Sequence, residues 1–369
     1  VRRKEAESGF KAVLITDEIN NFYGAYTSPE IHRLEEAGVD VILTRLSRLR
    51  DSNPLYSAGW RLLMSWWGTG GPGWLPHPLS STGRKVTARA YMKVLNFKAN
   101  HRKVLVTDQG CLLSSMNPHD ASSRHSNIGF AARGPICRDI LRAEKAVAEF
   151  SRGDTENWPA EPAAFEPPAA GPPRASVRLL TEGKIRRELL EALDGAGPGH
   201  QVDLAMFYLS DRQVVNALVA ADGRGASVRL VLDPNKDAFG RQKGGVPNRP
   251  VADELLDRSD GRIRVRWYDT RGEQFHTKLV RVARGDAVAV FGGSANLTRR
   301  NIGDFNLEAD LQLFLTRDSP VAREVEDYFE RIFSNRDGDY TLPYQAYAND
   351  GWVKTARYRI EESTGFCSY

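Results

Sequence analysis

Apolar runs alternate along the chain with segments whose apolar positions recur at a helical spacing. The runs rich in Val, Ile and Leu predict β-strands at 11–16, 39–43, 201–208, 227–232 and 263–267. The amphipathic segments between them predict helices at 30–37, 184–193, 212–221 and 251–258. Strands that alternate with amphipathic helices indicate an α/β fold in which helices cover the sheets.

The same order of predicted elements occurs twice. In the first copy a helical stretch that ends at Gly9 leads to a strand and then to Asp17. In the second copy a helix that ends near Gly225 leads to a strand and then to Asp233. A short acidic helix, an alternating strand and a His-x-Lys triplet follow in both. This repetition predicts two halves of like fold.

The second copy has an extra strand and helix in front, at 201–208 and 212–221. We therefore expect the natural protein to extend further towards its N-terminus, where a membrane anchor could lie. The predicted domains are an N-terminal half over 1–150 that lacks its first strand and helix, a linker over 151–175 and a C-terminal half over 176–369. The linker holds six prolines and shows no apolar period, which predicts an extended surface segment.

Composition narrows the picture only a little. A chain of 369 residues with 41% hydrophobic content can bury a sizeable core. The net charge of +4, from 51 basic and 47 acidic residues, tolerates an anionic partner without identifying one. Cys111, Cys137 and Cys367 form no Cys-x-x-Cys pair and have no histidine at zinc-ligand spacing, so we expect no structural zinc and leave the redox compartment open. No run approaches the roughly 20 apolar residues of a membrane span.

The candidate catalytic residues form two clusters that contain similar residue types in the same order. The first cluster contains His101, Lys103, Asp108, Ser115, Asn117 and Asn127, and the second contains His276, Lys278, Ser294, Asn296, Asn306 and Glu308. Alternation along a strand points the His and Lys of each triplet to one face, which sets a nucleophile or acid beside a positive charge. Cleavage of a phosphodiester needs both, since the anion must be held while one histidine attacks phosphorus and another protonates the leaving oxygen.

The His-x-Lys triplet, followed by Asp108 in the first copy and by a Ser-x-Asn turn in both, resembles the paired signature of the phospholipase D superfamily. That superfamily includes phospholipase D enzymes and bacterial cardiolipin synthases. The resemblance covers essentially the whole chain. It implies two pseudo-twofold-related α/β halves, with mixed sheets flanked by helices and an active site at their interface that is complete within one chain. It also implies a phosphohistidine intermediate, no metal and no other cofactor.

The resemblance assigns roles to these residues by position. His101, Lys103 and Asn117 match the first half-site, and His276, Lys278 and Asn296 match the second, with Ser115 and Ser294 as hydroxyl residues of the turns and Asn127 and Asn306 in support. The N-terminal histidine of such pairs usually becomes phosphorylated, so His101 is the expected nucleophile and His276 the general acid. We align Glu308 with Gly129 and expect Glu308 to accept a hydrogen bond from His101 across the interface. His276 is then expected to face Gly129.

The two motifs differ in one spacing. Asp108 is interpreted as a support for the hairpin that follows the first triplet. After Lys278 the first acidic residue is Asp286, three residues later than the pattern expects, which predicts a longer hairpin in the second half. His119 and His125 follow the first motif and are interpreted as polar loop residues, with a place at the entrance of the site as the less favoured alternative. Asp120 or Asp304 is an alternative carboxylate for the histidines.

Four of the seven tryptophans fall within fifteen residues, from Trp60 to Trp74. One interpretation is a helix buried by its aromatic face and followed by a glycine-rich turn. The other is an interfacial loop in which Trp66, Trp67 and Trp74 contact lipid, since tryptophan favours membrane interfaces. The sequence leaves both open.

Three functions remain. The first is a phospholipid phosphodiesterase or phosphatidyltransferase that acts at a membrane surface, with water or an alcohol as acceptor, and that is peripheral or anchored by a segment before Val1. The second is a metal-independent nucleic-acid phosphodiesterase, which the nearly balanced charge disfavours. The third is a non-catalytic anion-binding protein, which two intact half-sites make the least favoured. Headgroup, acceptor and side of the membrane stay open.

Overall fold

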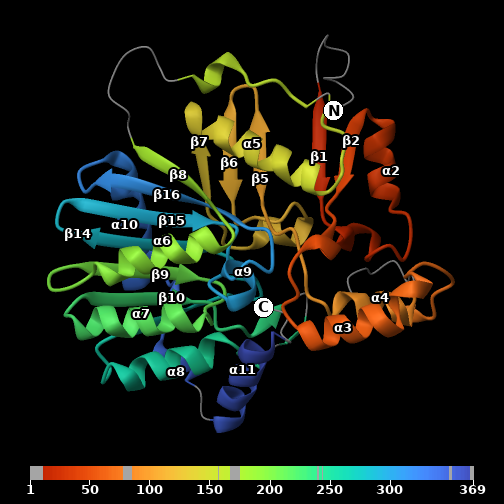
Figure 1. Cartoon of the computed structure of the whole chain (residues 1–369). Helices are drawn as coiled ribbons and strands as arrows, with labels where there is room; N and C mark the ends of the chain where they lie inside the picture. Colours follow the sequence, from red (N-terminus) through yellow and green to blue (C-terminus); the bar gives the residue numbers. More distant parts are fainter. Residues whose placement is uncertain are drawn as a thin grey trace.

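The computed structural model describes residues 11–77, 85–156, 158–166, 175–238, 241–242, 244–348 and 351–365. Two α/β halves lie side by side, the N-terminal half in red to yellow and the C-terminal half in green to blue (Figure 1). The predicted α/β fold with helix-flanked mixed sheets is therefore confirmed. The stretch that ends at Gly9 and the residue Cys367 lie outside the described residues. Within these, no helix combines the length and apolar content that a bilayer crossing needs.

An eight-stranded mixed sheet forms the centre of the C-terminal half, in the order β17-β13-β10-β9-β14-β15-β16-β8. Its strands are β8 (Ser176–Thr181), β9 (Gln201–Met206), β10 (Ser227–Leu232), β13 (Arg264–Tyr268), β14 (Lys278–Arg284), β15 (Ala287–Gly293), β16 (Ala309–Thr316) and β17 (Thr341–Pro343). Strand β10 runs parallel to both β9 and β13, whereas β14 pairs antiparallel with β9. Strand β9 therefore joins the parallel part of the sheet to the antiparallel hairpins.

Helices cover both faces of this sheet because its strands are apolar on both sides. The helices of this half are α6 (Gly183–Asp194), α7 (Arg212–Gly223), α8 (Asn248–Arg258), α9 (Arg299–Ile302), α10 (Pro320–Ser334) and α11 (Trp352–Thr364). Leu204 of β9 packs in the cluster that contains Leu189 of α6 and Leu218 of α7. The next residue, Ala205, packs in the opposite cluster with Phe329 of α10. The alternation of the strand thus divides the core into two layers.

The N-terminal half repeats part of this plan. Its elements are β1 (Ala12–Thr16), α2 (Pro29–Glu36), β2 (Val39–Leu43), β5 (Val104–Thr107), β6 (Gly110–Ser114), β7 (Gly129–Ala132) and α5 (Pro135–Phe150). Strands β1 and β2 are parallel like β10 and β13, and β5, β6 and β7 form antiparallel hairpins like β14, β15 and β16. Among the described residues no strand takes the place of β9, so the two pieces form separate sheets.

An insertion between β2 and β5 contains the tryptophan-rich segment. It consists of α3 (Pro54–Leu63), the 3-10 turn η3 (Ser65–Trp67), the short strands β3 (Leu75–Pro76) and β4 (Lys85–Val86), and α4 (Ala88–Val94). Helix α3 begins where Pro54 fixes the first turn and the Asn53 side chain accepts a hydrogen bond from the Tyr56 amide at 3.2 Å. The helix gives way to the 3-10 turn after Leu63, and Gly68, with a φ of 63°, ends that turn.

The segment between the halves differs from the expected extended linker. Residues Ala163–Phe165 form a 3-10 turn, and the Phe165 side chain is fully buried against α5 and the C-terminal sheet. Glu161 forms ion pairs with Arg138 and Arg142 of α5. These contacts attach the described part of the linker to the body of the protein.

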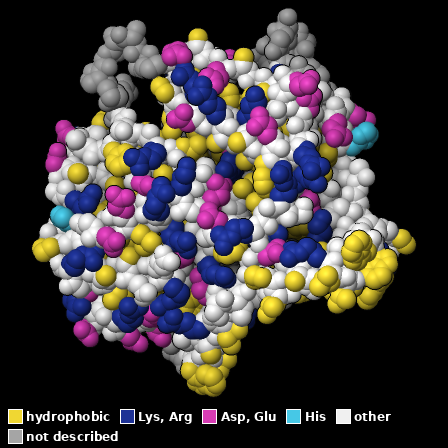
Figure 2. Space-filling model, viewed as in Figure 1, with side chains coloured by type: hydrophobic (Ala, Val, Ile, Leu, Met, Phe, Trp, Pro, Cys, Tyr) yellow, Lys and Arg dark blue, Asp and Glu magenta, His cyan; other side chains and the backbone are white. Residues whose placement is uncertain are grey.

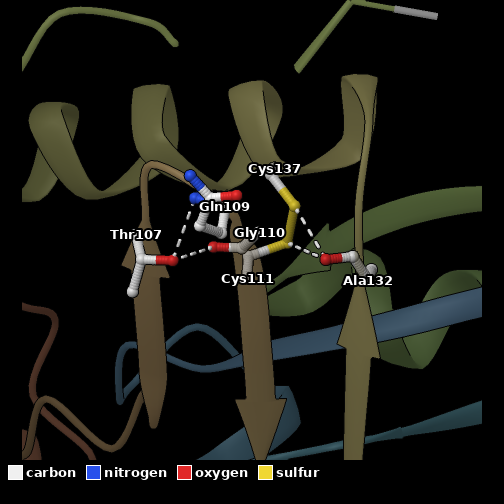
Figure 3. The surroundings of a disulfide bond; sticks show 6 residues. All are labelled: Thr107, Gln109, Gly110, Cys111, Ala132 and Cys137. Carbon is white, nitrogen blue, oxygen red and sulfur yellow. Dashed lines mark hydrogen bonds between the residues drawn. A yellow bond between two sulfur atoms is a disulfide. The ribbon is translucent and has the colours of Figure 1, made fainter. Parts of the chain in front are cut away.

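A disulfide joins Cys111 of β6 to Cys137 of α5 (Figure 3). The two residues are 26 positions apart, so only the packing of α5 on the hairpin brings their Cα atoms to 5.4 Å. The bond ties the strand that leads into the first Ser-x-Asn turn to the helix that covers it. Sequence spacing alone did not indicate this pairing.

Candidate active site

His101 reaches across the interface between the halves. Its Nδ1 lies 2.9 Å from Oε1 of Glu308, which directly precedes β16. The His101 amide donates to the Leu307 carbonyl at 2.8 Å, and the Leu307 amide donates to the Ala99 carbonyl at 3.0 Å. These backbone bonds hold the segment before β5 against the segment before β16. The structure therefore has the crossed pairing that we predicted for His101 and Glu308.

His276 also reaches across the interface between the halves, but its partner there is Asn127. The Nδ1 atom of His276 lies 3.1 Å from Asn127 Oδ1. The Ser126 amide donates to the Gln274 carbonyl at 3.0 Å, which repeats the backbone contact of the other crossing. The expectation that His276 faces Gly129 is therefore wrong.

The hairpin registers explain the error. Gly129 pairs with the last residue of β6, and Asp310 pairs with the last residue of β15. Gly129 therefore corresponds to Asp310, and counting back two residues makes Asn127 the counterpart of Glu308. The two halves place an amide and a carboxylate at equivalent positions.

The serines of the two turns orient these partners. The Ser115 hydroxyl donates to Asn127 Oδ1 at 3.2 Å. In the other half the Ser294 hydroxyl donates to the carboxylate of Glu308. Both serines are fully buried. Each one fixes the side chain that faces the histidine of the opposite half.

The orientation of the Asn127 amide follows from its other bonds. Its Nδ2 donates to the carbonyls of Ser122, at 2.8 Å, and His125, at 3.0 Å. The oxygen must then face His276, so the proton of the imidazole lies on Nδ1 and Nε2 carries the lone pair. Glu308 favours the same tautomer in His101.

Electrostatics keep His101 neutral and Glu308 ionised. Burial lowers the pKa of His101 to about 4, although the charge of Glu308 raises it part of the way and that of Lys103 lowers it. Burial acts to raise the pKa of Glu308, but His101 and Lys103 outweigh it and hold that pKa below its usual value. At neutral pH the imidazole of His101 therefore has a free lone pair on Nε2.

Each lysine folds back on its own triplet. Lys103 Nζ donates to the His101 carbonyl at 2.6 Å, and Lys278 Nζ donates to the His276 carbonyl at 2.9 Å. Burial lowers the pKa of Lys103 to about 8 and that of Lys278 well below its usual range. The triplets do not lie within strands as predicted, because β5 begins at Val104 and β14 begins at Lys278. The alternation of a strand therefore does not orient them.

The two half-sites act on each other electrostatically. The pKa of His276 is held well below its usual value, first by burial and then by the charges of Lys278 and Lys103. Lys103 belongs to the other half. The structure thus brings the two predicted histidines and two predicted lysines into one site.

Two aspartates that sequence reasoning left without a role support the triplets. Asp17 follows β1 and accepts the Asn100 amide at 2.7 Å, directly before His101. Asp233 follows β10 and accepts the Phe275 amide at 2.8 Å, directly before His276. Burial raises the pKa of Asp17 to about 6. The available signal was the repeat itself, since an aspartate ends the first matching strand of each copy.

A third histidine lies beside the site. The ring centroid of His125 is 6.0 Å from that of His276. The ring centroid of His119 is 6.5 Å from that of His125. The charge of Lys278 contributes, after burial, to lowering the pKa of His125. His125 thus lies next to His276, and its place at the entrance of the site stays a prediction.

The remaining predicted residues lie around this centre. Asp108 lies on the exposed β5–β6 turn, where the Gln109 side chain donates to it at 2.9 Å, and its role as a hairpin support stays a prediction. Strand β14 has 7 residues against 4 in β5, which is the longer hairpin predicted from the late Asp286. Asn306 accepts the Ala99 amide at 3.1 Å. Asp304 binds the Gly183 amide instead of a histidine.

Asn117 and Asn296 lie on the turns that follow β6 and β15, two residues after Ser115 and Ser294. Asn296 is buried, and none of the described residues donates a hydrogen bond to its Oδ1. The role of both asparagines as amide donors to a phosphate stays a prediction.

The tryptophan cluster divides into two parts. Trp60 is buried, as the interpretation of a packed helix requires. Trp66, Trp67 and Trp74 are 79%, 66% and 70% exposed. Figure 2 shows the resulting hydrophobic surface on the right, over the end of α3 and η3. For these three side chains the buried alternative is excluded.

Across the described ranges, no three His, Cys, Asp or Glu side chains are grouped so that they could hold a metal ion.

Comparisons with known proteins relate the chain to one family model and to several solved structures. Residues 189–333 match the family described as "Cardiolipin synthase, PLD-like domain". No curated protein matches the chain. Among solved structures, phosphatidylserine synthase of Haemophilus influenzae Rd KW20 is similar over 97% of this chain and 89% of its own, with a TM-score of 0.53 and 11% identity. Nuc of Salmonella typhimurium, a phospholipase D family member, is similar over 46% of this chain and 98% of its own, with a TM-score of 0.35 and 19% identity.

The family match lies in the C-terminal half, and the fold shared with the Haemophilus synthase extends over both halves. Together with the paired His-x-Lys motifs, these similarities support the recognition made from the sequence. Residues 189–333 therefore contain a phospholipase D-like domain, of a family whose members are phosphodiesterases and transferases.

Proposed function

We propose that this protein is a phospholipid phosphodiesterase or phosphatidyltransferase that works through a phosphohistidine intermediate. The observation that carries the proposal is the crossed pairing, in which each histidine meets a partner from the opposite half: Glu308 for His101 and Asn127 for His276. The unequal partners give the two histidines unequal chemistry.

In the first step Nε2 of His101 attacks phosphorus and the bond from phosphorus to the leaving oxygen breaks. The imidazole becomes positively charged as it bonds phosphorus, and the buried carboxylate of Glu308 stabilises that charge through Nδ1. The leaving oxygen takes a proton from Nε2 of His276. The bound phosphodiester carries the negative charge that favours the protonated form of His276 before this transfer.

In the second step water or an alcohol attacks phosphorus, and His276 takes the proton of the attacking oxygen. The nitrogen–phosphorus bond breaks and His101 returns to its neutral form. Asn127 suits this exchange, because an amide oxygen orients the imidazole without adding a charge that would retain the proton. Lys103 and Lys278 supply positive charge for the non-bridging oxygens in both steps.

A phospholipid is the favoured substrate for two reasons. The family that matches the C-terminal half is described by cardiolipin synthase, and the Haemophilus structure is named a phosphatidylserine synthase. The exposed Trp66, Trp67 and Trp74 also suit a membrane interface. We propose a membrane-associated, peripheral protein whose acceptor is water or an alcohol.

The direct test is incubation with labelled phosphatidylglycerol, phosphatidylcholine and single-stranded DNA, each with and without added alcohol, followed by product analysis. The proposal expects phosphatidic acid in water and a new phosphatidyl ester with alcohol. Cleavage of the DNA alone would assign the site to the nuclease members of the superfamily. A matched series in EDTA is expected to keep full activity, and activity restored only by a divalent ion would contradict the proposed chemistry.

A further inference from the structure

Helix α11 buries a tyrosine and a glutamate and exposes three large apolar side chains. Tyr358 and Glu362 face the body of the protein and are 0% and 4% exposed. Trp352, Val353 and Ile360 face outwards and are 81%, 60% and 62% exposed. At the helical repeat these three side chains fall on one side of the helix. Large apolar side chains gathered on one exposed face mark an interaction site.

Polar contacts anchor the inner side of this helix. The Tyr358 hydroxyl donates to the Ser210 carbonyl at 3.1 Å, and the Ser210 hydroxyl donates to Glu362 at 2.8 Å. The Arg299 amide donates to the same carboxylate at 3.2 Å. The helix is therefore held in one orientation. Its apolar row, which consists of Trp352, Val353 and Ile360, stays exposed to solvent.

A cationic cavity lies beside this row. It has a volume of about 580 Å³, and its lining includes Arg186, Arg212, Arg299, Arg359 and Ile360. The exposed Ile360 thus belongs both to the apolar row and to the rim of the cavity. Asp211 and Glu362 are the acidic side chains of the lining, against four arginines.

The arginines near the cavity outnumber the carboxylates that pair with them, although Arg186 has its own partner, Asp211, at 3.5 Å. Arg212, Arg258 and Arg359 all pair with the single carboxylate of Glu254, at 2.6, 2.9 and 2.9 Å. One negative charge therefore serves three guanidinium groups, and a surplus of positive charge remains beside the apolar row. Arginine binds phosphate with two parallel hydrogen bonds, which suits such a place to a phosphate group.

Helix α11 also lies next to the tryptophan-rich insertion. Gly365, which ends α11, lies so close to the Ser52 carbonyl, just before α3, that a Cβ atom at this position would clash with it. Figure 2 shows hydrophobic side chains at two projections, one on the right over the end of α3 with η3 and one at the bottom over the lower end of α11. The two apolar surfaces extend in different directions from the contact between Gly365 and Ser52.

We infer that α11 and its arginine cavity form a docking site for membranes of anionic phospholipid, separate from the catalytic histidines. The apolar row enters the interfacial layer, and the arginines receive the phosphate of a lipid headgroup. Apolar side chains flanked by surplus positive charge favour this occupant over a protein surface, because an anionic bilayer offers both complementary layers at once. The inference rests on the proposed function, since the site would hold the enzyme on the membrane that contains its substrate.

Sedimentation with vesicles tests the apolar row. The variant Trp352→Ser/Ile360→Ser is expected to bind vesicles of phosphatidylglycerol and phosphatidylcholine about tenfold more weakly or worse than the unaltered protein. Turnover of a small soluble phosphodiester should not change. The matched control is Leu105→Ser, which removes a side chain that is 58% exposed on β5 and should leave vesicle binding unchanged.

Charge variants test the cavity. Arg359→Gln is expected to weaken binding to vesicles that contain phosphatidylglycerol and to have little effect on vesicles of phosphatidylcholine alone. The control Arg323→Gln removes an exposed charge from α10 and should bind as the unaltered protein does. Added salt should reduce the difference between Arg359→Gln and the unaltered protein.

The outcomes separate this inference from the proposed function. Unaltered vesicle binding in both α11 variants would overturn the docking site and leave the catalytic proposal standing. Normal vesicle binding that depends on α11, with no turnover of any phospholipid, would overturn the catalytic proposal alone. Self-association that is lost in Trp352→Ser/Ile360→Ser, with unaltered vesicle binding, would assign the face to a second copy of the chain.

Discussion

The carboxylate of Glu308, from the C-terminal half, lies 2.9 Å from Nδ1 of His101, from the N-terminal half. The carboxylate is fully buried, so the hydrogen bond operates at low dielectric, where it orients and polarises the imidazole strongly. The equivalent position opposite His276 holds the amide of Asn127. This difference between the two partners is the basis for the roles proposed for the histidines.

Trapping the intermediate tests those roles. Substrate with a good leaving group is mixed with enzyme and quenched rapidly in acid, and the modified peptide is mapped. His276→Ala should still form some adduct on the peptide that contains His101, because such a leaving group departs without a proton. His101→Ala should form none. An adduct on the His276 peptide would reverse the assignment.

Asn127→Asp places a carboxylate opposite His276. Burial and the charges of Lys278 and Lys103 hold the pKa of His276 well below its usual value, and a negative charge at Asn127 acts to raise it. The limb of the pH–rate profile that reports loss of the proton from His276 should therefore move to higher pH. Asn127→Ser, which adds no charge, is the control. Equal profiles for the two variants would show that His276 does not titrate in the rate-limiting step.

Lys103 gives a pH dependence of substrate binding. Its pKa is lowered to about 8, so the charged form predominates below that pH and is lost as the pH rises through it. A phosphodiester keeps one negative charge over this range, so a change in its KM reports a change in the protonation of the enzyme. We expect KM for a soluble phosphodiester to rise several-fold between pH 7 and pH 9. Lys103→Met should have a high KM that no longer changes in this range.

Trp66, Trp67 and Trp74 should matter for lipid and not for folding. Because they are exposed, replacing all three with Ala should weaken vesicle binding while leaving the melting temperature and the hydrolysis of a soluble phosphodiester nearly unchanged. Trp60→Ala is the matched control, since Trp60 is buried and its loss should cost about 3–5 kcal/mol of stability. A large fall in melting temperature for the triple variant, with unaltered vesicle binding, would contradict the interfacial role.

The repeat made most of the fold accessible to prediction. Strand β10, predicted at Ser227–Leu232, has those bounds, and the predicted β1 differs by one residue. Each such element can be predicted from the apolar period of its own residues. The crossing from His101 to Glu308 was also predictable, because a pseudo-twofold site sets the turn of one half against the triplet of the other.

The partner of His276 was not predictable in the same way. Its identity depends on the register of the β6–β7 hairpin against that of β15–β16, and the two halves differ in loop and strand length. A register shift of two residues keeps every apolar alternation intact, so the pattern could not reveal it. The pairing of Cys111 with Cys137 depends likewise on how α5 packs, which no local pattern encodes.

The junction of two unequal half-sites in one polypeptide has a genetic consequence. In a homodimer of a single half, any residue opposite one histidine is opposite the other as well, and a substitution alters both together. Here the codons for Asn127 and Glu308 are separate, so each can mutate without the other. Covalent fusion thus converts a symmetric pair of interchangeable histidines into two positions that selection can tune independently.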